Sequence, residues 1–293
     1  MKPSYVAAVS LEINVKQLKL CLFVWGLMNS LAFAGTLGEV SSASANQTGI
    51  FIGLGGSYNF VRLNSNLSGT LNVTGGFPPL GVFAGGRESF HNSADDFSLE
   101  AQAGYFKHFP GSEWLWGLEF FYQYTNLKIR SPAFVRAIDL TDPAVSTTDT
   151  MSLAAIEAKV NDTLMLPAFI GRSYKNSFIY VGIGPSLFNT QQKITEINDT
   201  ESAYYLGSLN GITKNKWIWG GAVQAGMAYY VNSTWFFKLN YICAFTGNYA
   251  LNKTVAFAPE MNQGFNSGTF SFHSRQSLVS QEVALSLNKV FAL

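Results

Sequence analysis

Four charged residues stand in segments that are otherwise apolar or small, and they could form an ion-pair cluster: Glu100, Glu119, Glu282 and Lys238. Each lies in a stretch that alternates in character with a period of two, which predicts a β-strand. If these strands enclose an interior, the four groups face it, and buried charge is tolerated only when it is paired. We therefore expect a plugged, polar interior in which Lys238 pairs with one or more glutamates; the sequence does not say which. The alternative is a gated, narrow, cation-preferring path, because three carboxylates face one ammonium.

The clearest of these strands is Trp114 to Thr125, WLWGLEFFYQYT. One face carries only large apolar and aromatic side chains, and the other mixes Glu119 with small and polar residues. Aliphatic residues at mid-depth with aromatic rings at both ends are typical of a strand that crosses a bilayer. Similar faces predict an aromatic girdle made of Trp114, Trp116, Tyr122, Tyr124, Trp217, Trp219 and Trp235.

Eight such segments follow one another along the chain. They are about Ile50–Leu63, Phe97–His108, Trp114–Leu127, Val160–Gly171, Phe178–Thr190, Trp217–Val231, Trp235–Gly247 and Leu278–Phe291. Short and long connections alternate between them, as in bacterial outer-membrane barrels but not in soluble sandwiches. The sequence thus predicts an all-β, eight-stranded antiparallel transmembrane up-and-down β-barrel with short periplasmic turns and four long extracellular loops. Pro167 and Pro185 lie inside two of the strands and predict a bulge or bend there.

Composition supports this class. Charged residues make up 13% of the 293 residues and aromatics 15%, against roughly 25% charged in soluble domains. No run of about 18 apolar residues occurs beyond the N-terminal region, which argues against spanning helices. The net charge of +1 comes with no basic stripe, which argues against nucleic acid as a partner.

The N-terminal region predicts export. Residues 1–34 have the features of a cleaved signal peptide: flanking lysines, an apolar core from Leu20 to Met28 and an Ala32-Phe33-Ala34 cleavage site. Residues 35–48 are small and polar and predict a flexible periplasmic lead-in. The barrel is then expected over residues 49–293, in the bacterial outer membrane.

The signal, the eight aromatic-rich strands and the final VALSLNKVFAL together make the region from Gly49 to Leu293 resemble small outer-membrane barrels of the OmpA/OmpX kind. The resemblance implies that the last strand is read by the barrel-assembly machinery. In that family the strand usually ends on its aromatic residue, whereas here Ala292 and Leu293 follow Phe291. It also implies that a lumen charge cluster can gate by exchanging partners.

The long connections are expected to carry function. The fourth would expose Phe257, Phe265, Phe270 and Phe272 to a host surface, another protein or lipopolysaccharide, and the second would form a short helix over Met151–Lys159. His91, Asp95, Asp96 and His273 could converge at the outer rim, as a lipid-modifying enzyme would require. We expect instead a monomeric, non-enzymatic surface protein without cofactor or metal, structural or adhesive in role. The alternatives are a small porin-like channel and, more remotely, that enzyme.

Overall fold

The computed structural model describes residues 48–76, 81–85, 88–139, 149–198, 212–257 and 267–293. Every regular element in these ranges is a β-strand, and none of them contains a helix that could span a membrane. The strands are β1 (Gly49–Gly75), β2 (Gly81–Gly85), β3 (Glu88–His108), β4 (Trp114–Asp139), β5 (Asp149–Met165), β6 (Ala168–Ser173), β7 (Ser177–Asn198), β8 (Ile212–Tyr230), β9 (Trp235–Thr246), β10 (Tyr249–Phe257) and β11 (Ser267–Ala292). The predicted signal peptide lies outside the described residues.

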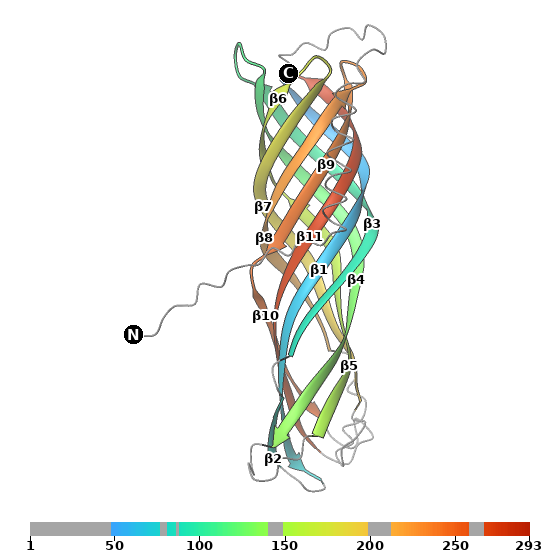
Figure 1. Ribbon diagram of the computed structural model, residues 1–293, viewed down its shortest axis with the longest axis vertical. Coiled ribbons are helices and arrows are strands. Elements are labelled where there is room, and N and C mark those ends of the chain that lie inside the picture. The colour runs from blue at the N-terminus through green and yellow to red at the C-terminus, as the bar shows by residue number, and fades with distance from the viewer. Residues whose placement is uncertain (1–47, 77–80, 86–87, 140–148, 199–211, 258–266) are drawn as a thin grey trace, which may run out of the picture. The chain divides into compact units, whose positions relative to one another are not determined.

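The strands close into an antiparallel ring (Figure 1). Its order is β1, β3, β4, β5 with β6, β7, β8, β9 and β11, and β11 pairs again with β1. β5 and β6 share the same two neighbours and count as one of the eight strands of the ring, which we call staves. β2 and β10 are extra strands near the long hairpins. The predicted eight-stranded up-and-down barrel is therefore confirmed.

The ends with short connections agree closely with the prediction. The turns at 109–113, 174–176 and 231–234 join β3 to β4, β6 to β7 and β8 to β9. Gly111 adopts a φ of 68° in the first turn, a conformation that glycine accepts without strain. This end, where the C-terminus also lies (Figure 1), is the periplasmic end.

The opposite end of the barrel, where the long loops were predicted, differs from the prediction, because much of the expected loop sequence forms strands. β1 was expected to end near Leu63, yet it continues to Gly75, and its pairing with β11 runs from Gly49↔Ala292 to Gly75↔Ser267. Pairing between neighbouring strands satisfies the backbone hydrogen bonds of these polar stretches. Their side chains lack the alternating aromatic residues that marked the other strand segments.

The helix expected over Met151–Lys159 is wrong. These residues belong to β5, which pairs with β4 on one side and β7 on the other. A helix of this length is marginal on its own, whereas the strand obtains partners on both edges. Tertiary pairing thus overrides the local helix propensity.

The two prolines behave differently. Pro167 lies between β5 and β6, where a bulge or bend was predicted. Glu119 N–H of β4 donates to Pro167 O at 3.0 Å, so β4 remains bonded to the chain at this interruption. Leu166 N–H donates across to Pro185 O at 3.0 Å. Pro185 itself stays within β7, and the register with β8 passes through Pro185↔Gly221 without a shift.

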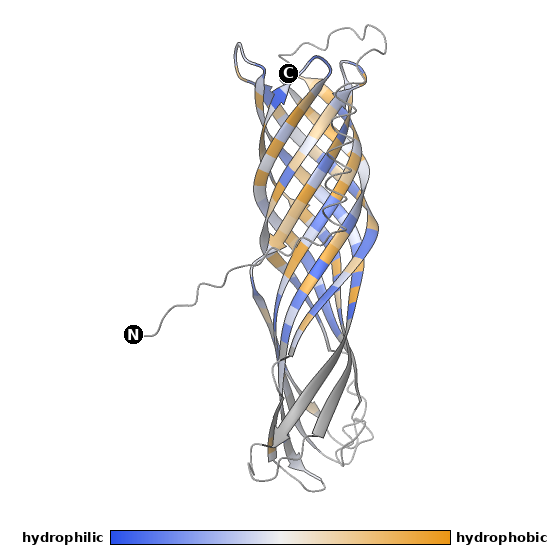
Figure 2. Ribbon diagram, in the orientation of Figure 1, coloured by the Kyte–Doolittle hydropathy of each residue, from blue (hydrophilic) through white to orange (hydrophobic). Residues whose placement is uncertain are grey.

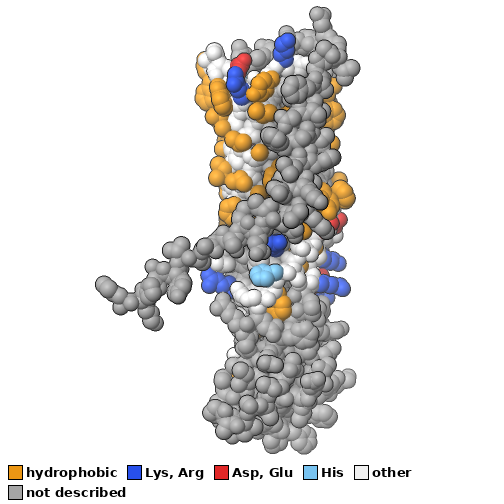
Figure 3. Space-filling view, viewed as in Figure 1, with side chains coloured by type: hydrophobic (Ala, Val, Ile, Leu, Met, Phe, Trp, Pro, Cys, Tyr) orange, Lys and Arg blue, Asp and Glu red, His pale blue; other side chains and the backbone are white. Residues whose placement is uncertain are grey.

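An apolar belt surrounds the ring near its periplasmic half. Figure 2 shows hydrophobic and polar residues alternating along the staves there, and Figure 3 shows the hydrophobic side chains on the surface. The seven predicted girdle residues all lie on this outer face, with exposed fractions between 36% (Tyr122 and Trp235) and 70% (Trp219). Leu54, Ile183 and Val181 are exposed by 70%, 68% and 57%. Large apolar side chains in such number on an outer face fit the hydrocarbon of a bilayer.

Depth within this belt predicts the cost of an added charge. Leu54→Arg places a guanidinium in the middle of the belt and is expected to destabilise the barrel by about 2–4 kcal/mol, whereas Ile50→Arg, at the end of the same strand, should cost about 0–1 kcal/mol. Denaturant unfolding in phospholipid vesicles measures both. Equal costs would show that this face does not lie in lipid.

Candidate functional site in the barrel lumen

Strand alternation directs a polar cluster into the lumen. β9 shows the pattern plainly, since Phe236, Lys238, Asn240, Ile242 and Ala244 are buried while their neighbours face outward. Period-two geometry forces this arrangement once one residue of the strand points inward.

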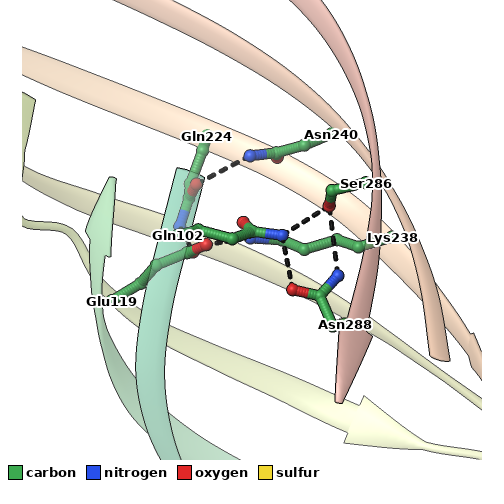
Figure 4. A network of polar contacts seen from close by, with 7 residues as sticks. All are labelled: Gln102, Glu119, Gln224, Lys238, Asn240, Ser286 and Asn288. Carbon is green, nitrogen blue, oxygen red and sulfur yellow. Dashed lines mark hydrogen bonds and ion pairs between the residues drawn. The ribbon is translucent and has the colours of Figure 1, made fainter. Parts of the chain in front are cut away.

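The centre of the cluster is an ion pair between Lys238 Nζ on β9 and Glu119 Oε1 on β4 (Figure 4). The exposed fractions of the two side chains are 4% and 0%. Lys238 Nζ also donates to Gln102 Oε1 at 3.0 Å, and Gln224 Nε2 donates to Glu119 Oε2 at 3.3 Å. Asn240 Nδ2 in turn donates to Gln224 Oε1 at 2.9 Å. Both charges thus have partners beyond each other, which a buried pair needs.

The network continues onto β11. Gln102 Nε2 donates to Ser286 Oγ and, at 2.6 Å, to Asn288 Oδ1. The Lys238 ammonium also lies 5.2 Å from the centroid of the Tyr180 ring and 5.9 Å from that of Phe51. Amide side chains and aromatic faces therefore stabilise the ammonium in addition to its one ion pair.

The other two glutamates stand apart from Lys238. Glu100 and Glu282 are 4% and 3% exposed, and neither forms an ion pair within the described residues. Glu100 Oε2 and Glu282 Oε1 also lack a hydrogen-bond partner there. Neighbouring polar side chains also bond one another: Asn59 Nδ2 donates to Ser98 Oγ at 2.9 Å, and Gln123 Nε2 donates to Asn59 Oδ1 at 3.0 Å.

Apolar layers lie on both sides of the polar cluster. The periplasmic layer contains Phe51, Phe106, Leu115, Phe169, Phe178, Tyr180, Ala228, Phe236 and Val290. The extracellular layer contains Val61, Leu63, Phe121, Leu127, Ile129, Ala158, Val160, Met165, Phe188, Ala222, Ile242, Ala244 and Leu278. An eight-stranded barrel is just wide enough for side chains to fill, and these residues fill it.

Glycine makes room for the periplasmic layer. A Cβ at Gly104 would overlap the Phe51 ring, and one at Gly53 would overlap the Asn288 side chain. The sequence predicted the inward-facing Glu119 and Lys238, whereas Ser286, Asn288 and Tyr180 were missed. The alternation along each strand could have identified these three as facing inward.

The histidines and carboxylates that could have converged at the rim do not do so. β1 lies between His91 on β3 and His273 on β11. Asn64 is opposite His91 whereas Ser68 is opposite His273, so the two histidines are also offset by four residues. His91 Nδ1 lies 2.8 Å from Asn64 Oδ1, and Asp95 accepts from Tyr58. Asp96 bonds its neighbouring backbone, Phe97 N–H, at 2.8 Å.

The phenylalanines expected in the fourth loop also need correction. Phe272 is 5% exposed, because β11 continues through it and alternation points it inward with Ser274 and Gln276. Phe257 and Phe270 belong to β10 and β11, but their side chains lie outside what the structure describes, as does Phe265 altogether.

No protein-family model matches this chain, and no curated protein matches it either. Similar solved structures include OprG from Pseudomonas aeruginosa, with 14% identity, coverage of 85% of this chain and 98% of that chain, and a TM-score of 0.40. The outer membrane protease OmpT from Escherichia coli has 11% identity, 88% and 99% coverage and a TM-score of 0.40. Neisserial surface protein A has 13% identity, 80% and 97% coverage and a TM-score of 0.32.

These likenesses are too weak to carry an argument, so the class rests on the molecule itself. Only helices and closed barrels satisfy their backbone within a bilayer, and this chain closes a ring whose exterior is apolar. Barrels of this construction belong to the bacterial outer membrane. The chain is an integral outer-membrane β-barrel protein.

Proposed function

We propose that this barrel is a non-conducting, non-enzymatic surface protein whose extended staves present a binding or adhesive face outside the membrane. The observation that carries the proposal is the packing of phenylalanine rings across the lumen. Phe51, Phe106, Phe178 and Phe236 meet across the periplasmic end, and each is at most 4% exposed. Ring centroids 5.6 Å apart for Phe51 and Phe236, and 6.0 Å for Phe178 and Phe236, leave these rings in contact.

The length of the staves supports the second half of the proposal. β1 has 27 residues and β4 and β11 have 26 each, whereas about 9–11 tilted residues cross a bilayer. More than half of each strand therefore continues beyond the apolar belt. Paired strands hold a surface in place more firmly than loops do, which favours recognition of a partner by a preformed face.

A small cation channel is the second candidate. It is favoured by Glu100 and Glu282, two buried carboxyl groups that form no ion pair in the described lumen. The aromatic rings packed across the periplasmic layer argue against it, because an ion would have to pass them.

We infer the partners of the barrel from the positions of the apolar belt and of the staves beyond it. Outer-membrane lipid would contact the belt, and lipopolysaccharide and a host or surface ligand would contact the exposed staves. The assembly machinery would read β11, whose Phe291 is 47% exposed near the chain end. The ring closes within one chain, which is compatible with a monomer.

Adherence of bacteria that display the protein tests this function. A non-adherent Gram-negative strain producing the chain should bind cultured epithelial monolayers, or plates coated with laminin or fibronectin, above the empty-vector level. Removing residues 253–272 and joining Asn252 to His273, which pair directly, through an Asn-Gly turn should reduce binding. Lys175→Gln, in a periplasmic turn, serves as the control and should leave binding unchanged. Equal adherence of producing and empty-vector cells on every surface would contradict the proposal.

A further inference from the structure

Basic side chains gather on the outer face of β4, β5 and β7, just beyond the apolar belt. Lys128 and Arg130 follow Tyr124 on the outward face of β4, Lys159 lies outward on β5 and Lys193 outward on β7. Their sequence neighbours are buried in the lumen: Leu127, Ile129, Ala158, Val160 and Gln192. We name Lys128, Arg130, Lys159 and Lys193 the basic patch.

The sheet register brings the basic patch together in two rows. Lys128 is directly opposite Lys159. In the next outward row, Arg130 is opposite Glu157, and Glu157 is opposite Lys193. Arg130 Nε and Glu157 Oε2 form an ion pair at 3.0 Å. The patch thus holds four cations and one carboxylate, so three positive charges remain.

These three charges have no partner on the described chain. Lys128, Lys159 and Lys193 form no ion pair or side-chain hydrogen bond in the described residues. Directly opposed like charges destabilise a strand pair.

Arg172 and Lys289, at the periplasmic rim, differ because they have partners on the chain. Arg172 pairs with Glu113 at 2.7 Å, and the Lys289 ammonium lies 5.6 Å from the Trp235 ring centroid. Among the described residues, Lys128 and Lys159 are the only directly opposed lysines, and neither forms an ion pair, which points to an external anion.

The position of the patch indicates the source of that anion. Tyr124 is the last predicted girdle residue on β4 and is 51% exposed. Lys128 follows four residues later on the same face, about 13 Å along the strand at roughly 3.3 Å per residue. Figure 3 shows Lys and Arg side chains just beyond the hydrophobic band of the face it presents. Groups at this level meet the headgroups of the outer leaflet rather than its hydrocarbon.

We propose that the basic patch binds the phosphate groups of lipopolysaccharide in the outer leaflet. Phosphates on the lipid A sugars are anions fixed at headgroup depth, so they can sit between Lys128 and Lys159 and reach Arg130 and Lys193 from the same side. A soluble polyanion would not be confined to this depth. Each lysine near an anionic membrane surface contributes about fivefold to binding.

The test compares lipid A forms on the purified full chain in a zwitterionic detergent. Probes are bis-phosphorylated lipid A, dephosphorylated lipid A and a heparin oligosaccharide, and thermophoresis measures each Kd. Lys128→Gln with Lys159→Gln should weaken binding of bis-phosphorylated lipid A by about 25-fold and leave dephosphorylated lipid A unaffected. Lys175→Gln, an exposed lysine at the opposite rim, should change neither.

Thermal unfolding supplies an independent test, because the double substitution should raise the Tm in the absence of lipid A but reduce the rise in Tm that lipid A causes. Without lipid A the double variant should melt above the wild-type chain, because the opposed charges are gone. Bis-phosphorylated lipid A should then raise the Tm of the wild-type chain much more than that of the variant. If the double variant does not fold, Lys159→Gln alone should show a loss of about fivefold.

Two results would overturn the proposal. One is unchanged affinity for bis-phosphorylated lipid A in the double variant and in Lys159→Gln. The other is heparin that binds more tightly than lipid A and displaces it, which would assign the patch to a soluble polysaccharide.

Discussion

Replacing Lys238 by Met is expected to destabilise the barrel by about 3–5 kcal/mol, because it leaves a buried carboxylate without its cation. Among the described residues, Glu119 would keep only Gln224 as a side-chain partner. The variant also loses the contact of the ammonium with the Tyr180 ring. Denaturant unfolding in vesicles, followed by tryptophan fluorescence, gives the free energy of unfolding.

A double-mutant cycle separates the ion pair from general packing. Glu119→Gln combined with Lys238→Met removes both charges and should recover most of the loss, because no unpaired charge from the pair remains. Lys175→Met, at an exposed turn, should change stability by less than about 0.5 kcal/mol. Additive single and double effects would show that Lys238 and Glu119 do not interact in the folded protein.

Replacing Phe236 by Ala should have the other large effect, a loss of about 3–5 kcal/mol. Phe236 is fully buried, with ring neighbours Phe51, Phe178 and Tyr230 within 6.0 Å between centroids. The substitution leaves a cavity in the periplasmic layer that surrounding staves cannot close. Unfolding in vesicles again measures it.

The matched control is the next residue on the same strand. Phe237 lies on the outer face and is 46% exposed, so Phe237→Ala replaces a lipid contact and creates no cavity. Its cost should be less than half that of Phe236→Ala. A similar cost for both would mean that the periplasmic layer is not tightly packed and that the lumen is not sealed by it.

The sequence predicted most of what lies within the membrane. Alternation along Trp114–Thr125 and its counterparts identified the staves, the outward aromatic residues and the inward Glu119 and Lys238, because one periodicity determines all three. The short turns were also predictable, because turn-forming residues such as Pro110-Gly111 stand between two alternating segments.

The partner of Lys238 was not predictable, because it depends on register around the whole ring. Glu119 reaches Lys238 across the barrel although β4 and β9 are not neighbours. No local pattern encodes that offset. Glu100 and Glu282 carry the same charge and the same inward position, so residue type could not discriminate among the three.

The outer parts of the staves were missed for a different reason. Beyond the belt, the outer face meets water and the inner face mixes apolar residues with polar ones such as Ser274 and Gln276, so the alternation in hydrophobicity that marks a half-buried strand fades. Phe272 and Met151–Lys159 were therefore assigned to loops, although pairing with neighbouring strands continues through both. The adjacency of β1 and β11 made it possible for the rim histidines to converge, but β1 itself separates them.

The most direct test of the sealed lumen is single-channel recording of the purified full chain in a planar bilayer. Heat-modifiable migration should first show that the inserted protein is folded. We predict no conductance steps, because apolar layers close the lumen on both sides of the Lys238–Glu119 pair. Discrete steps whose size or ion preference changes in Glu119→Gln would contradict this account and show a pore lined by the charge cluster.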